Sequence, residues 1–139
     1  MRHLKLLICA LALAAGTAQA GPTLSPVDEA LDCSDGGSTH YERTMCSRRP
    51  MVEADARLTR VYQALRKALR AEDKRAEQVL VSAQRAWIAG RDAETELCTA
   101  ASWGLDGSGY GQAYASCYTS LLDERTAELR QYLRNVQSR

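Results

Sequence analysis

Residues 80–98 constrain the fold more than any other stretch, because they place a large aromatic, polar groups and a cysteine at helical spacing. On a helix, residues three and four apart share a face, and here that face carries Leu80, Gln84, Trp87, Arg91, Glu94 and Cys98. A face with Leu, Trp and Cys is normally a core face. Gln84 and Arg91 then need polar partners from elsewhere in the chain, since an unpaired buried charge is very costly.

The rest of the chain is also helical in pattern. Apolar residues recur at helical spacing between Met51 and Leu69 and again between Tyr114 and Val136, and no segment shows sustained alternation. Between them, Gly104, Gly107, Gly109 and Gly111 interrupt the pattern. We expect an all-α antiparallel bundle of three principal helices, at Thr44–Arg70, Asp73–Ala101 and Gln112–Val136.

The boundary between the first two helices has a weak signal. The apolar phase continues from Leu69 to Leu80, so local rules permit one continuous helix of about 75 Å. Such a helix would expose its apolar stripe unless the chain dimerised. A turn near 71–73 with Asp73 as N-cap suits a monomer, and we favour it. Pro50 is compatible with a helix start or with a kink.

The first twenty residues have the pattern of a secretory signal peptide. A short basic start precedes an apolar run that is too short to span a membrane, and Ala18-Gln19-Ala20 is a small-x-small cleavage signal. Cleavage after Ala20 leaves 119 of the 139 residues and lowers the Lys and Arg count from 18 to 16, against 17 Asp and Glu. This balance argues against a nucleic-acid partner. We expect a periplasmic or secreted protein with a solvated acidic arm at 21–38 and a helical domain at 39–136.

The mature chain keeps four cysteines. An even number in a small exported protein predicts two disulfides, and four cysteines allow three pairings. We favour Cys33–Cys46 and Cys98–Cys117, because both close short loops. A metal or redox site is not expected, since the chain has no C-x-x-C spacing and one mature histidine, His40. No cofactor is predicted.

Three blocks of the chain resemble the LprI-like lysozyme inhibitor family of small exported bacterial domains. The first is Cys46 with Asp55, Leu58 and Tyr62; the second is residues 83–88 with 91–93; the third is Cys117 with Leu121, Arg125, Thr126 and Leu129. Thr95 stands where the family usually has a cysteine, and Cys98 follows three residues later on nearly the same face. The resemblance implies a helical bundle that binds a glycan-cleaving enzyme.

Five polar residues form a candidate structural cluster: Asp55, Gln84, Arg91, Asp92 and Arg125. Asp and Arg are rarely buried unless paired, so these residue types suit mutual pairing inside the bundle. We expect Asp55, Arg91 and Arg125 to meet there and fix the helix register. The alternative is a ligand-binding polar cluster.

The glycine-rich loop is the candidate partner-binding site. It offers Trp103, Asp106, Tyr110 and Tyr114 close to two cysteines, and aromatics on a constrained loop are typical of binding hot spots. The alternative is that Trp103 and Tyr114 only cap the core.

Catalysis is not expected. His40 is the only mature imidazole, and the carboxylates of Asp92, Glu94 and Glu96 point in different directions on a helix. With catalysis set aside, the resemblance implies an inhibitor or immunity protein against a lysozyme-type peptidoglycan hydrolase. The alternative is a non-catalytic cell-envelope interaction module, monomeric or oligomeric, with no lysozyme target.

Overall fold

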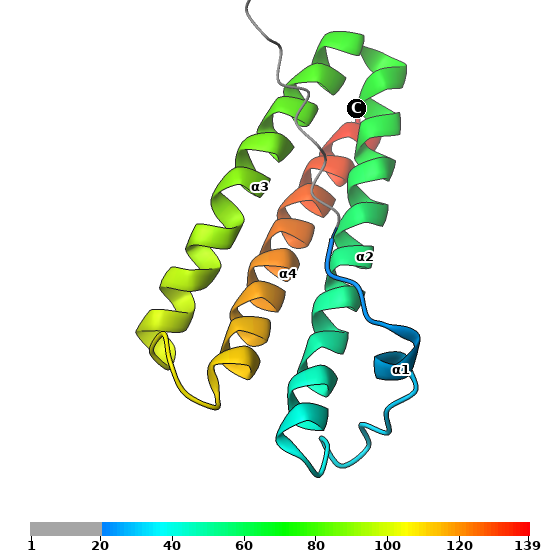
Figure 1. Ribbon diagram of the computed structural model, residues 1–139. Coiled ribbons are helices and arrows are strands. Elements are labelled where there is room, and N and C mark those ends of the chain that lie inside the picture. Colours follow the sequence, from blue (N-terminus) through cyan, green and yellow to red (C-terminus); the bar gives the residue numbers. More distant parts are fainter. Residues whose placement is uncertain (1–20) are drawn as a thin grey trace, which may run out of the picture.

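The computed structural model describes residues 21–139, so the predicted signal peptide lies outside the described residues. Within them the chain is all-α, as predicted. A short helix α1 (Pro26–Glu29) precedes three long helices, α2 (His40–Glu72), α3 (Lys74–Ser102) and α4 (Tyr110–Gln137). The long helices run up, down and up, so that α2 and α4 are parallel and α3 is antiparallel to both (Figure 1).

Helix α2 begins four residues earlier than the apolar pattern predicts, because a capping box sets its start. The Thr39 hydroxyl accepts from the Glu42 backbone N–H, and the Glu42 carboxylate accepts from the Thr39 N–H at 2.8 Å. Pro50 lies inside α2, so it neither starts nor ends the helix, and its side chain is exposed.

The turn between α2 and α3 is a single residue, and the predicted N-cap is confirmed. Asp73 has an extended backbone, its N–H donates to the Leu69 carbonyl at the end of α2, and its carboxylate accepts from the Arg75 N–H at 2.8 Å. One turn into α3, the buried carboxylate of Glu77 forms ion pairs with Arg66 at 2.7 Å and Arg70 at 3.6 Å. The turn is therefore held by a cap and by an ion-paired cluster that links α2 to α3.

The apolar core belongs mainly to α2 and α4. Its buried apolar members on these two helices are Met51, Ala54, Leu58, Leu65, Ala115, Tyr118, Leu122, Leu129 and Val136. Helix α3 adds one buried apolar residue, Leu80, and several buried polar ones. The sequence placed Glu94 on the buried face of α3, and this is wrong: Glu94 is exposed, and Thr95 and Thr99 are fully buried instead.

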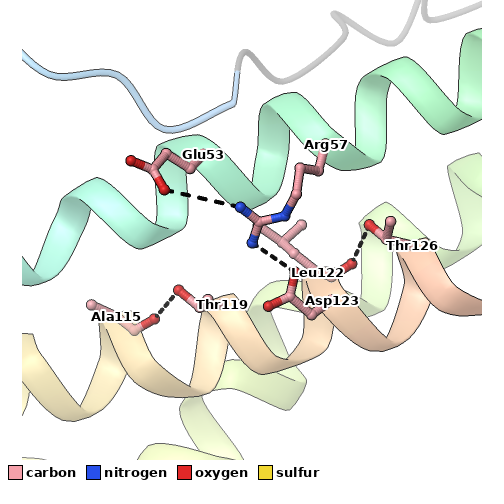
Figure 2. A network of polar contacts seen from close by, with 7 residues as sticks. All are labelled: Glu53, Arg57, Ala115, Thr119, Leu122, Asp123 and Thr126. Atoms are coloured by element: carbon pink, nitrogen blue, oxygen red, sulfur yellow. Dashed lines mark hydrogen bonds and ion pairs between the residues drawn. The ribbon is translucent and has the colours of Figure 1, made fainter.

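Buried threonines satisfy their hydroxyls within their own helices. Thr95 donates to the Arg91 carbonyl at 2.8 Å, and Thr99 donates to the Thr95 carbonyl at 2.7 Å. Figure 2 shows the same bond from Thr126 to Leu122 in α4, beside an ion pair in which Arg57 of α2 reaches Asp123 of α4 at 2.9 Å. This self-contained bonding lets α3 present a polar face to the core without unpaired groups.

Both predicted disulfides are present. Cys33 and Cys46 have Cα atoms 5.6 Å apart, and Cys98 and Cys117 have Cα atoms 5.9 Å apart. The first joins the N-terminal segment to α2, and the second joins the end of α3 to the start of α4.

The acidic segment 21–38 is not a free arm. Most of its acidic side chains are exposed, as expected, but its backbone is tied to α2. Arg49 donates to the carbonyls of Asp28, Glu29 and Leu31, and the Tyr41 hydroxyl donates to the Asp28 carboxylate at 2.6 Å. In Figure 1 the blue segment accordingly runs beside α2. The charge pattern of the sequence could not predict this attachment, because Arg49 binds backbone carbonyls and not acidic side chains.

Candidate protein-binding site

The loop between α3 and α4 is shaped by two glycines and one tryptophan. Gly104 follows the end of α3 with φ of 103° and donates to the Thr99 carbonyl, a common helix-ending role for glycine. The Trp103 ring covers Gly109, where an added Cβ would lie 2.2 Å from the ring. One face of the indole therefore packs against the loop, while the residue as a whole remains 59% exposed.

Large apolar side chains gather on this loop and beside it. Trp103 is joined by Leu105, which is 64% exposed, and by Leu97 on the last turns of α3, which is 63% exposed. The sequence interpretation missed both leucines. The exposure of Leu97 could have been predicted from the sequence, because Leu97 does not share a helix face with the residues of α3 expected to be buried. The exposure of Leu105 could not, because it depends on the conformation of the loop. We name Leu97, Trp103 and Leu105, together with Asp106 and Tyr110, the loop face.

The four residues predicted for partner binding differ in exposure, although the ring centroids of Tyr110 and Tyr114 lie 5.9 Å apart. Trp103 and Asp106 are exposed, and Tyr110 is half-buried at the start of α4. Tyr114 packs against the hydrophobic core, with its ring centroid 6.1 Å from that of Tyr118. Burial also raises the pKa of the Tyr114 hydroxyl. Its position fits the core-capping alternative, while the other three remain available to a partner.

Helices α2 and α4 both begin at the end of the bundle that carries the α3–α4 loop (Figure 1). The disulfide Cys33–Cys46 joins the first turns of α2 to the segment before it, and Cys98–Cys117 joins the two helices that flank the loop. Two exposed carboxylates, Glu94 and Glu96, lie in the same last turns of α3 as Leu97, and Asp106 belongs to the loop face itself. The loop face is therefore an apolar surface with acidic neighbours.

The predicted polar cluster is two groups rather than one network. In the first, Arg91 donates to Asp92 at 2.9 Å, and its guanidinium lies 4.7 Å from the centroid of the Tyr118 ring. Burial raises the pKa of Tyr118 to about 12. The phenol therefore stays neutral and offers Arg91 its ring face.

The second group is centred on Arg125. This side chain is 9% exposed, donates from Nε to Gln84 at 3.0 Å, and forms an ion pair with Glu128. The hydrogen bond from Arg125 holds the pKa of Glu128 below its usual value. The Trp87 ring lies between the two groups, 5.9 Å from the Arg91 guanidinium and 5.8 Å from that of Arg125.

Asp55 corrects the expectation of a direct meeting with Arg91 and Arg125. Across residues 21–139 it has no ion pair within 4.0 Å and no hydrogen-bond donor. Burial raises the pKa of the Asp55 carboxyl, and the more distant charge of Arg91 only partly opposes this. Helical periodicity placed these side chains on inward faces, but it could not show that Asp92 and Tyr118 would engage Arg91 first.

Two grooves lie away from the loop. One, of about 540 Å³, runs between α3 and α4 over Leu65, Leu80 and Leu129 and is largely apolar. The other, of about 560 Å³, is lined by Arg66, Arg70, Lys74 and Arg85 around the paired Glu77.

The side-chain arrangement and the helices of the described residues also bear on metal binding and on membrane spans. No set of three or more His, Cys, Asp or Glu side chains in the described part of the chain is arranged to hold a metal ion. None of the helices described is long and apolar enough to cross a membrane.

Comparison with known proteins decides the family. A family model described as lysozyme inhibitor LprI matches residues 32–129. The chain belongs to the LprI family. An uncharacterized protein of Rhizobium meliloti (strain 1021) is 30% identical over 117 residues, which cover 77% of this chain and 82% of that protein. No solved structure matches the chain.

The LprI match contains all four cysteines of the disulfides and the whole loop face. The description of the LprI family is that of a lysozyme inhibitor and names no catalytic activity. Membership also implies a protein partner, a lysozyme, for the family as a whole.

Proposed function

We propose that this protein is exported to the periplasm and inhibits a lysozyme-type peptidoglycan hydrolase by binding it through the loop face. The observation that carries the proposal is the exposure of Trp103 and Leu105 on a loop braced by the Cys98–Cys117 disulfide, and of Leu97 on the last turns of α3 beside it. Apolar anchors surrounded by polar groups are typical of interface hot spots.

The brace supports binding in a specific way. Segments that are already rigid lose less conformational entropy when a partner binds. Here the disulfide joins the two helices that flank the loop. Within the loop, the Trp103 ring packs on Gly109 and limits the movement of the loop backbone. Acidic neighbours such as Glu94, Glu96 and Asp106 would speed encounter with a basic enzyme surface.

Export is supported by the disulfides and by the signal pattern of residues 1–20. Structural disulfides form and persist in oxidising compartments such as the periplasm. Peptidoglycan hydrolases act in the same compartment, so inhibitor and target would meet there.

The test is inhibition of purified lysozymes by the mature protein and two matched variants. Leu105→Ala removes a 64% exposed leucine from the loop face, and Val79→Ala removes a 64% exposed valine on α3, near the opposite end of the bundle. We expect Leu105→Ala to weaken inhibition about tenfold, the effect of about 1.4 kcal/mol, and Val79→Ala to leave it unchanged. Both should keep the melting temperature, because neither side chain is in the core.

A second pair of changes, Asp106→Ala with Tyr110→Ala, should weaken inhibition further. Equal inhibition by the Leu105 and Val79 variants would remove the loop face from the interface. If about 50 μM protein, far above the Kd of a micromolar complex, slows no animal, phage or bacterial lysozyme, the inhibitor function is wrong. The apolar groove between α3 and α4 would then favour a cell-envelope interaction module.

A further inference from the structure

Gly21 lies directly against the Asp55 side chain. A Cβ added to Gly21 would lie 2.3 Å from Asp55 Oδ2 and 2.7 Å from its Cγ. Any larger residue at this position would therefore require the Asp55 carboxylate to move. Standard bond lengths then place the backbone nitrogen of Gly21 within about 5 Å of the carboxylate.

Asp55 has no hydrogen-bond donor among the described residues. The carboxylate is half-buried, and no group in residues 21–139 donates a hydrogen bond to it. The charged and titratable groups that face it are Arg91 from α3 and Tyr118 from α4. Arg91 is already paired with Asp92 and stacked on the Tyr118 ring, so it does not neutralise Asp55.

The segment that brings Gly21 to this place is held by α2. Arg48 donates to the Thr23 carbonyl at 3.4 Å, and Arg49 binds three carbonyls from Asp28 to Leu31. The predicted cleavage after Ala20 would make Gly21 the first residue and turn its amide nitrogen into a primary ammonium. With no residue before it, the ammonium nitrogen can also move by rotation about the Gly21 Cα–C bond, and so close the remaining distance to Asp55.

We propose that Asp55 is the binding site for the α-ammonium group of the mature chain, created when the segment before Gly21 is removed. The ammonium and Asp55 form an ion pair beside Arg91 and Tyr118. This ion pair fastens the N-terminal segment to α2. This inference rests on the proposed export and cleavage and is independent of lysozyme binding.

The experiment compares mature protein that begins at Gly21 with the same protein extended by Ser-Ala before Gly21. The extension keeps an ammonium but moves it two residues away from Asp55. We expect the α-amino pKa of the Gly21 form, followed by NMR with labelled glycine, to lie about one unit above the usual 7.7–8.0. The extended form should melt at a temperature lower by about 4 °C.

Asp55→Asn identifies the partner, and Glu53→Gln is the matched control, since Glu53 is an exposed carboxylate of α2 whose ion pair is with Arg57 and not with Arg91. Asp55→Asn should return the α-amino pKa to its usual range and make the melting temperature insensitive to the extension. Glu53→Gln should leave both effects in place.

Three results would overturn the proposal. The first is an exported protein whose mass shows a start other than Gly21. The second is an ordinary α-amino pKa in the Gly21 form. The third is an extension that lowers the melting temperature equally with and without Asp55. Lysozyme inhibition is measured separately, and its loss or retention does not bear on this ion pair.

Discussion

At the scale of single residues, α3 is attached to the bundle more by polar side chains than by apolar ones. Glu77 binds two arginines of α2 near one end, and Trp87 lies between two guanidiniums in the middle. The sequence predicted that Gln84 and Arg91 would need buried partners, and Gln84 indeed binds Arg125. It did not predict Glu77, because a glutamate at the first turn of a helix normally faces solvent.

Glu77→Gln should lower the free energy of unfolding by about 1–2 kcal/mol. The substitution keeps the shape but removes a charge-assisted hydrogen bond from a buried position. The loss stays moderate, because Arg66 and Arg70 are partly exposed and regain water. Urea unfolding measures the change. Glu72→Gln, at an exposed ion pair with Arg139, is the control and should change little; equal losses would contradict a special role for Glu77.

At the scale of elements, helix starts were the least predictable feature. The apolar pattern predicted α2 from Thr44, whereas the Thr39–Glu42 capping box begins it at His40. Periodicity reports only where apolar residues are needed, and the first turn of α2 lies beyond the core. The turn at Asp73 was predictable, because a side chain that caps locally was available at the point where a monomer must reverse direction.

The capping box should make stability depend on pH. Backbone N–H groups of Thr39 and Ser38 lower the pKa of Glu42 from 4.5. Since the folded-state pKa is the lower one, the carboxylate contributes stability above pH 4.5, and this contribution is lost as the pH falls through the lowered value. Unfolding of the wild type and Glu42→Ala should differ at pH 7 and converge well below pH 4.5. A difference that does not change with pH would contradict this role.

At the scale of the whole molecule, the fold and the cysteine pairing followed from the sequence, but the site did so only in part. Three amphipathic stretches and one glycine break determine a three-helix bundle, and short loop closure favoured the observed disulfides. The exposure of Leu105 and the burial of Tyr114 depend on how the loop returns to α4. No pattern in the chain reports that path.

The two disulfides should differ in their effect on the loop. Replacing either pair by serine should cost about 3 kcal/mol in the chain-entropy view. Only Cys98→Ser with Cys117→Ser should also speed amide exchange in residues 103–109, because the other bond fastens the N-terminal segment to α2. Denaturant unfolding and hydrogen exchange measure the two quantities. Faster loop exchange in both variants would show that the brace is not local.

An odd number of long helices leaves the peptide dipoles of the bundle unbalanced. Helices α2 and α4 both begin at the loop end, and only α3 opposes them, so that end carries an excess of about half a positive charge. Glu42 lies in the first turn of α2, while Arg70 and Arg134 lie in the last turns of α2 and α4. The acidic loop end thus suits the fold as well as a basic partner. Exchanging acidic and basic residues between the two ends would weaken the bundle even with the net charge unchanged.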